Sequence, residues 1–104
     1  MCWPPHGMPW RRAEFASEAK AELVAAAEWY EVRAPGVGSA FLDHVEKTLA
    51  VIVEHPGAGR PHAKHSEVRL CPLRRFPFVL VYAEGAPIVV IAVAHTRREP
   101  DYWR

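Results

Sequence analysis

The chain of 104 residues lacks the features of an exported or membrane protein. Its two cysteines, Cys2 and Cys71, are too few for a disulfide scaffold and form no CxxC pair. No apolar run approaches the ~20 residues that a membrane-spanning helix needs. The opening MCWPPHGMP also has no apolar stretch typical of a secretory signal. We therefore expect a cytoplasmic protein with no membrane contact, in which residues 1–9 form an irregular leader and residues 10–104 form one domain.

Complete residue sets for several common chemistries are missing as well. His55, His62 and His65 gather around one loop, but no Cys, Asp or Glu completes a four-ligand zinc set, so we expect solvent-exposed histidines without a metal. The stretch APGVGSAF lacks the GK[ST] of a phosphate-binding loop, and its glycines fit a turn between helices. No serine or cysteine has the local signature of a catalytic nucleophile. The sequence therefore predicts neither a metal nor a cofactor.

Hydrophobic periodicity predicts a short strand followed by two helices. The strand covers residues 10–15, and the first helix, capped by Ser17, extends to Arg33. A second helix, capped by Ser39, extends to about His55. The expected buried stripes are Ala19, Leu23, Ala26 or Ala27 and Tyr30 in the first helix, and Phe41, Leu42, Val45, Leu49, Ile52 and Val53 in the second. Two such helices joined by a short turn form a helical hairpin.

The second half of the chain reads as strands. After a polar loop at 56–66, strands are predicted at 67–71, 74–82 and 88–95, with a turn at AEGAP. The last of these is apolar on both faces, which is typical of a central strand. The order β-α-α-β-β-β predicts an α+β domain with a helical hairpin packed on one face of a small, mostly antiparallel sheet.

Charge is distributed unevenly along the chain. Residues 1–54 carry five Lys or Arg against eight Asp or Glu, whereas residues 55–104 carry eight against four. The basic set of the second half includes Arg69, Arg74, Arg75, His95, Arg97, Arg98 and Arg104, with Tyr102 and Trp103 interleaved. Such a set could cleave a phosphodiester by acid–base catalysis, form a solvated rim, or line a groove for an acidic or amphipathic partner. The residue chemistry alone leaves these three interpretations open.

Five stretches, taken in order, carry a family resemblance. They are the AxxELxxAxxWYE pattern at 19–31, PGVGSAFL at 35–42, EHPGAGRP at 54–61, RRFPFVLVY at 74–82 and AVAHTRREPDYW at 92–103. From about Trp10 onward the chain resembles the RelE/ParE superfamily of toxins from type II toxin–antitoxin modules, often labelled plasmid-stabilisation proteins. The predicted order of elements agrees with the fold that this resemblance implies.

The superfamily has two branches, which differ in their targets. RelE-like members cleave mRNA on the ribosome, whereas ParE-like members poison DNA gyrase. The ribonuclease branch has arginines where this chain has Val79 and Thr96, although Arg75 and Tyr102 match its arginine and tyrosine. Losing one cation that stabilises a transition state typically costs ~100-fold in rate. The resemblance therefore favours a gyrase-poisoning toxin without nuclease activity, with a ribosome-dependent mRNA endoribonuclease and a decayed, non-toxic binding module as alternatives.

The two branches assign different roles to the basic residues. If the chain is a ribonuclease, its candidate catalytic residues are Arg75, His95, Arg97 and Tyr102. In the favoured interpretation, the residues that contact the target or the antitoxin are Arg69, Arg74, Arg75, Arg97, Arg98, Tyr102 and Trp103.

The resemblance also implies partners. A cognate antitoxin would wrap the toxin across the helical hairpin and the sheet, and DNA would be bound only indirectly, through the antitoxin. We expect such a partner to cover exposed apolar surface at Trp29, Phe41, Phe78 or Trp103. DNA gyrase or the ribosome would be the target.

Overall fold

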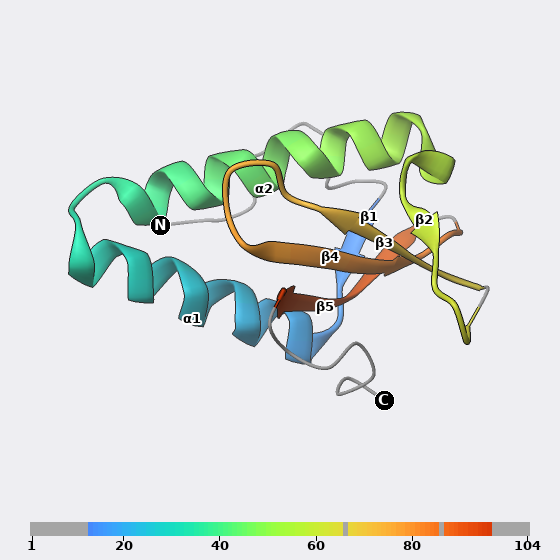
Figure 1. The fold of residues 1–104 in the computed structure, drawn as a ribbon, viewed down its shortest axis with the longest axis horizontal. Helices are drawn as coiled ribbons and strands as arrows, with labels where there is room; N and C mark the ends of the chain where they lie inside the picture. Colours follow the sequence, from blue (N-terminus) through green and yellow to red (C-terminus); the bar gives the residue numbers. More distant parts are fainter. Residues whose placement is uncertain (1–12, 66, 86, 97–104) are drawn as a thin grey trace.

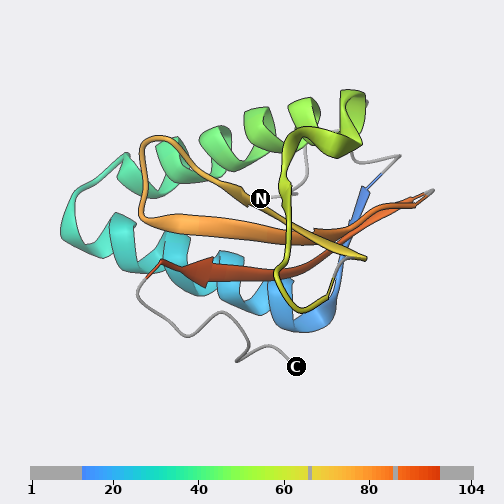
Figure 2. The ribbon, with the colours of Figure 1, turned by 45° about the vertical axis from the view of Figure 1, so that its right-hand side comes forward.

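Two helices cover one face of a five-stranded sheet in the computed structural model, which describes residues 13–65, 67–85 and 87–96 (Figures 1 and 2). The helices are α1 (Ser17–Arg33) and α2 (Val37–Glu54), followed by the single 3-10 turn η2 (Pro56–Ala58). The strands are β1 (Ala13–Phe15), β2 (Arg60–Pro61), β3 (Val68–Pro72), β4 (Phe78–Ala83) and β5 (Ile88–His95). Their order across the sheet is β1-β5-β4-β3-β2, and only the β1–β5 pair is parallel. The predicted α+β class, with a mostly antiparallel sheet, is confirmed.

Hydrophobic spacing located both helices well. Ala19, Leu23, Ala26 and Ala27 are buried on α1, and Phe41, Val45, Leu49 and Ile52 are buried on α2. Tyr30, Leu42 and Val53 are partly buried against the same core. None of the helices in the described ranges is long and apolar enough to cross a membrane.

The two predicted serine caps are wrong. α1 begins at Ser17 itself, with Ala16 at the cap position, and the Ser17 hydroxyl donates to the Glu18 carboxylate at 3.4 Å. α2 begins at Val37 with Gly36 at the cap, which places Ser39 inside the first turn. Neither helix has a side-chain cap hydrogen bond from its own cap residue.

A carboxylate from the preceding helix caps α2 instead. The two oxygens of Glu31 accept the backbone N–H groups of Gly36 and Gly38, each at 3.0 Å. Gly36 adopts a φ of 91°, which favours glycine, and a Cβ on Gly38 would lie 2.5 Å from the carbonyl oxygen of Ala27. The glycines of APGVGSAF therefore serve the helical hairpin, and Glu31 occupies the N–H groups that an anion would need.

Two strand assignments need correction. The loop at 56–66 contains η2 and the two-residue strand β2, a ladder too short to produce a periodic pattern. The predicted strand over 74–82 begins only at Phe78, because residues 74–77 form the turn between β3 and β4. The Leu73 N–H closes this turn on the Phe78 carbonyl at 2.9 Å, and Pro77 has no N–H to contribute to a ladder.

A buried tyrosine ties the loop after α2 to the sheet. The Tyr82 hydroxyl donates to the Pro56 carbonyl at 2.7 Å and accepts the Gly59 N–H at 2.9 Å. A Cβ on Gly59 would lie 2.8 Å from that hydroxyl and from the Leu70 carbonyl oxygen, so only glycine fits there. Tyr82 is fully buried, which makes both hydrogen bonds necessary to satisfy its polar group.

Removing the Tyr82 hydroxyl should destabilise the fold. We expect Tyr82→Phe to lower the free energy of unfolding by about 1–3 kcal/mol, because the Pro56 carbonyl and the Gly59 N–H lose their buried partner. Tyr30→Phe is the matched control and should change it by less than about 0.5 kcal/mol, since the Tyr30 hydroxyl makes no hydrogen bond within the described residues. Urea unfolding measures both variants.

The buried hydroxyl of Tyr82 should make the stability of the fold depend on pH in the alkaline range. Burial, the largest cause, raises the pKa of Tyr82 above its ordinary value of 10.0. The folded state thus favours the neutral phenol. The stability that this preference contributes is fully present below the pKa of the unfolded chain and is lost as the pH rises through the pKa of the folded state. Stability should fall above about pH 10, and Tyr82→Phe should reduce that fall. An identical alkaline profile in wild type and variant would contradict this assignment.

Replacing the carboxylate that caps α2 should loosen the helical hairpin. Glu31→Ala should lower the free energy of unfolding by about 1–2 kcal/mol, because two N–H groups at the start of α2 lose their acceptor. Glu28→Ala, an exposed glutamate one turn earlier on α1, should have little effect. Thermal unfolding compares the two, and equal effects would rule out the cap.

Candidate functional site

A cavity of about 540 Å³ opens between α1 and the adjoining ends of β4 and β5. We call it the α1–β5 groove. It is lined by Glu22, Ala25, Ala26, Trp29, Tyr30, Pro77, Phe78, Val93 and His95. Most of this lining is apolar, with three ionisable side chains, Glu22, Tyr30 and His95, among it. Such a lining suits an apolar side chain of a partner, with few polar groups to fix its orientation.

Aromatic packing positions the walls of this groove. Phe41 is fully buried, and its ring centre lies 5.2–5.4 Å from those of Tyr30, Phe76 and Phe78. The Phe78 ring is in turn edge-on to His95, with centres 5.1 Å apart. These rings join both helices to the β3–β4 turn and to the ends of β4 and β5. They fix Phe78 and His95 on the helix side of the sheet.

Trp29 forms the exposed rim of the groove. Its side chain is 52% exposed, and the guanidinium of Arg33 lies 3.7 Å from its ring centre. A stacked arginine holds the indole ring while leaving one face open. Of the four aromatic residues expected to expose apolar surface, Trp29 does so, Phe78 is partly buried and Trp103 lies outside the described residues. The expectation for Phe41 is wrong, because this side chain is fully buried.

Glu22 gives the groove its most specific polar contact. Its carboxylate accepts the backbone N–H of Val93 in β5 at 2.9 Å. Glu22 is not part of the buried stripe that helical spacing predicts for this helix. The spacing of Glu22, Ala25, Ala26 and Trp29 places one glutamate on a face of otherwise small and aromatic residues, which is the only signal that could have indicated this contact.

The opposite face of the sheet is apolar. Val68, Val81 and Ala92 are buried there, with Leu70, Val79 and Ile91 packed against them. Val79, where the ribonuclease branch has an arginine, therefore lies on this outer face, whereas His95 lines the groove on the helix face. The sheet separates these two positions, so they do not form one catalytic site.

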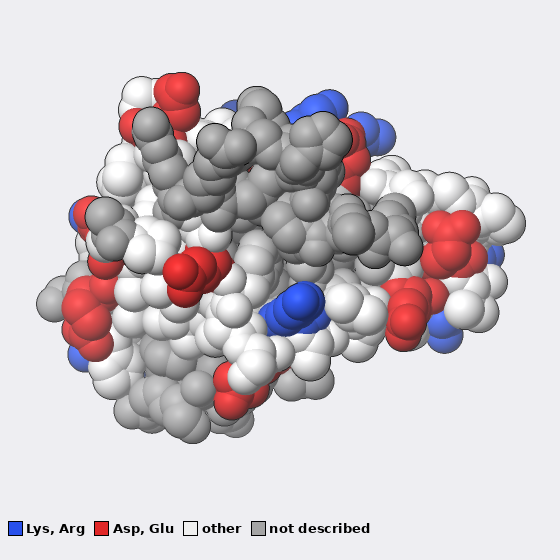
Figure 3. Space-filling model, turned by 180° about the vertical axis from the view of Figure 1, so that it is seen from behind, with Lys and Arg blue, Asp and Glu red and all other residues white. Residues whose placement is uncertain are grey.

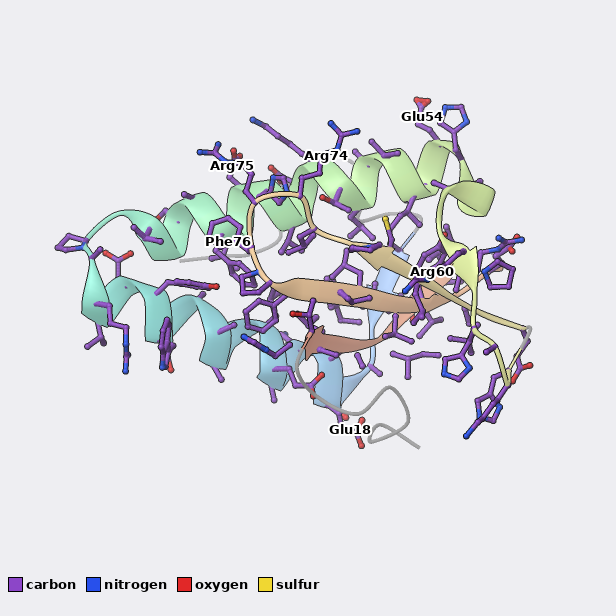
Figure 4. All side chains as sticks on the ribbon, in the orientation of Figure 1. Glu18, Glu54, Arg60, Arg74, Arg75 and Phe76 are labelled. Carbon is purple, nitrogen blue, oxygen red and sulfur yellow. The ribbon has the colours of Figure 1, made fainter. Side chains whose placement is uncertain are left out.

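The predicted contact arginines fall into two groups. Arg69 is engaged within the fold, since its guanidinium pairs with the Glu84 carboxylate and donates to the Gly59 carbonyl at 2.7 Å. Arg74 and Arg75 are exposed on the β3–β4 turn and point outward over α2, while Phe76 turns inward between the helices (Figure 4). The backbone N–H of Arg74 donates to Nε2 of His44 in α2 at 3.2 Å, and this hydrogen bond holds the turn in place. The remaining predicted residues, Arg97, Arg98, Tyr102, Trp103 and Arg104, lie outside the described residues.

Comparison with known proteins decides the family. Residues 13–100 match the family model described as the ParE toxin of the type II toxin–antitoxin system parDE. The chain belongs to the ParE toxin family. This confirms the resemblance to the RelE/ParE superfamily and assigns the chain to its ParE-like branch. No curated protein matches the sequence significantly.

A solved structure of a ParE relative has the same fold. It is described as the chromosomal ParDE TA system from P. aeruginosa, and it matches with a TM-score of 0.71. Sequence identity is 22%, over 84% of this chain and 97% of that chain. At this identity, the likeness shows that the two chains share a fold.

The histidine loop of this ParE-family chain differs from the prediction. His62 is buried rather than solvent-exposed, and its Nδ1 accepts the N–H groups of Lys64 and His65 at 2.9 and 3.2 Å. The Nδ1 lone pair is therefore used to shape the turn. Across the ranges that the structure describes, no three His, Cys, Asp or Glu side chains are arranged to hold a metal ion.

Cys71 of this ParE-family chain packs against the core from β3. Burial raises the pKa of its thiol, so the reactive thiolate is scarce at neutral pH. Cys71 therefore acts as a small apolar residue of the core.

Positive charge does not spread across the rear of this ParE-family chain. Figure 3 shows that face, where the described Lys and Arg side chains are few and acidic side chains are scattered among them. A protein that tracks a nucleic acid backbone needs a continuous basic stripe. On the described part of this face, the molecule presents none.

The two groups of arginines should respond differently to substitution. We expect Arg69→Met to lower the free energy of unfolding by about 1–2 kcal/mol, because the Gly59 carbonyl and Glu84 lose their donor. Arg75→Met is the matched control and should leave stability within about 0.5 kcal/mol, since its side chain is exposed. Chemical denaturation of both variants tests the assignment, and an Arg69 variant as stable as wild type would return Arg69 to the contact surface.

Proposed function

We propose that this chain is the growth-arresting toxin of a cytoplasmic type II toxin–antitoxin pair, that its target is DNA gyrase, and that a cognate antitoxin neutralises it. Membership of the ParE toxin family supports the toxin assignment. The antitoxin would carry the DNA-binding function of the pair, because the described rear face of this chain lacks a basic stripe.

The observation that carries the proposal is the placement of Val79 and His95 on opposite faces of the sheet. A phosphodiester-cleaving site needs a proton-transfer group and cations around the same phosphate. Here the outer face around Val79 is lined by aliphatic side chains, and the ring of His95 packs against Phe78 in the groove. This arrangement favours inhibition by binding over cleavage of mRNA.

Two apolar surfaces support neutralisation by a wrapping partner. The α1–β5 groove lies on the helix side, and the partly buried side chains of Leu70, Val79 and Ile91 lie on the outer face of the sheet. Val24, Val32 and Val51 add exposed apolar area on the helices. An antitoxin segment that passes from the helical hairpin to the sheet would cover both surfaces.

Arg74 and Arg75 are exposed and have no ion-pair partner among the described residues. They are proposed to contact the target or the antitoxin, together with Arg97, Arg98, Tyr102 and Trp103.

Induced expression separates the proposed target from the ribosome. Expression of the chain without its neighbouring gene should stop growth, induce the DNA-damage response and leave transcripts intact. His95→Ala should remain toxic, because the proposal assigns no proton transfer to His95. Transcript cleavage at ribosomal A-sites that His95→Ala abolishes would establish the ribonuclease instead. Normal growth with a folded chain would show a decayed, non-toxic module.

A further inference from the structure

We propose that the exposed side of α1 around Val24 binds the same side of a second copy of this chain, with the two helices antiparallel and related by a two-fold axis at Val24. In this pairing, Lys20 of each copy lies opposite Glu28 of the other copy. We call this surface the Val24 face; it consists of Ser17, Lys20, Ala21, Val24, Ala25 and Glu28. The inference goes beyond the proposed function, because self-association of the chain requires neither a target nor an antitoxin.

The first step is that α1 is apolar on both of its sides. One side packs its buried residues on the core under the sheet (Figure 2), so the opposite side points away from it. That opposite side exposes Val24 and Val32, by 46% and 82%, together with Ala21 and Ala25. Valine is a poor choice for a solvent-facing helical position, because its branched side chain loses rotamer freedom there. Since a helix that is apolar all round is normally buried all round, the sequence of α1 indicates a second contact.

The Val24 face is separate from the α1–β5 groove. Glu22 and Trp29 line the groove, and at 3.6 residues per turn Val24 lies about 140–160° around the helix from both of them. A shallow hollow of about 460 Å³ follows the Val24 face, and all of its described lining residues belong to α1. Ala25 is the one described residue that the hollow shares with the groove. A partner seated in the groove therefore leaves the apolar side chain of Val24 without an explanation.

The charges on this face are complementary to themselves. Lys20 and Glu28 lie symmetrically about Val24, four residues before it and four residues after it. Both side chains are exposed, and neither has an ion-pair partner among the described residues. Eight residues of helix separate the two by about 12 Å along the axis, which keeps them from pairing with each other. In an antiparallel pair centred on Val24, each lysine instead lies opposite the glutamate of the second copy, so the dimer contains this ion pair twice.

Other pairings of the same face lack this match. A parallel pairing would place Lys20 opposite Lys20 of the second copy, and an antiparallel pairing centred on Glu28 would place that glutamate opposite itself. Like charges in these positions repel each other and disfavour the contact. The pairing centred on Val24 also sets the small side chains of Ala21 and Ala25 beside it, where they allow the two helix axes to approach to about 8–10 Å. The charge pattern and the small residues together select a second copy of this chain as the occupant.

Sedimentation equilibrium of the purified chain tests the self-association. The wild-type chain should form a dimer at micromolar concentrations. Val24→Asp should make it monomeric, because a carboxylate would then meet its own copy at the two-fold axis. Val51→Asp is the matched control and should leave the dimer intact, since Val51 is exposed to a similar extent, 51%, but lies on α2. Circular dichroism of both variants verifies that the helices remain folded.

Charge reversal tests the antiparallel register. Lys20→Glu or Glu28→Lys alone should weaken the dimer about five- to thirtyfold at low salt, because each substitution acts at two symmetric contacts. The double variant Lys20→Glu/Glu28→Lys should recover the dissociation constant of the wild-type dimer, since both ion pairs return with their signs exchanged. Glu54→Lys, at the far end of α2 (Figure 4), is the control and should not change the dissociation constant.

Three results would overturn the pairing. A wild-type chain that stays monomeric would remove the second copy, and if Val24→Asp then weakened the complex with the product of the adjoining reading frame, the Val24 face would belong to that partner. A dimer that Val24→Asp leaves intact would place the contact elsewhere on the molecule. A double variant that dimerises as weakly as the single ones would exclude the antiparallel register. The proposed function is tested separately, by the induction experiment.

Discussion

The packing of three aromatic rings around a fourth, Phe41, is the constraint on which the rest of the molecule depends. Phe41 lies on α2, Tyr30 on α1, Phe76 on the β3–β4 turn and Phe78 at the start of β4, and their centres are 5.1–6.2 Å apart. Because each ring comes from a different element, their contact sets the angle of the hairpin and the path of the turn together. The groove wall at Phe78 and the outward aim of Arg74 and Arg75 both follow from this cluster.

The sequence predicted the elements whose causes are local. Both helices bury stripes with helical spacing, and β5 is apolar on both faces because it lies between β1 and β4. Most of the errors arise where a residue distant in the sequence determines where an element begins or pairs. Glu31, from the preceding helix, caps α2 in place of Ser39. The late start of β4 at Phe78 has a local cause, since Pro77 has no N–H to contribute to a ladder. The two residues of β2 depend on Leu70 and Arg69 across the sheet, and no periodic pattern records such a short pairing.

The site was harder to predict, because residue type does not reveal how a charge is used. The sequence grouped Arg69 with the exposed arginines, yet its guanidinium is bound to Glu84 and to the Gly59 carbonyl. Glu22 lies outside the predicted stripe, and helical spacing does not show that β5 passes beside it. The bulge at Ile91, which turns the Val93 N–H towards Glu22, depends on the register with β4 and has no signature in the sequence.

The groove and the exposed indole ring favour recognition by apolar shape. Within the described chain, Arg69 is used for structure, Arg33 stacks on Trp29 and Lys47 pairs with Asp43, so these three cations are engaged within the fold. The fold leaves exposed one face of the Trp29 indole and an apolar groove. A fold of this size buries only about two thirds of the surface of its unfolded chain. Apolar area that the fold cannot bury is therefore available at little cost in stability, and a partner that places an apolar side chain in the α1–β5 groove gains affinity there.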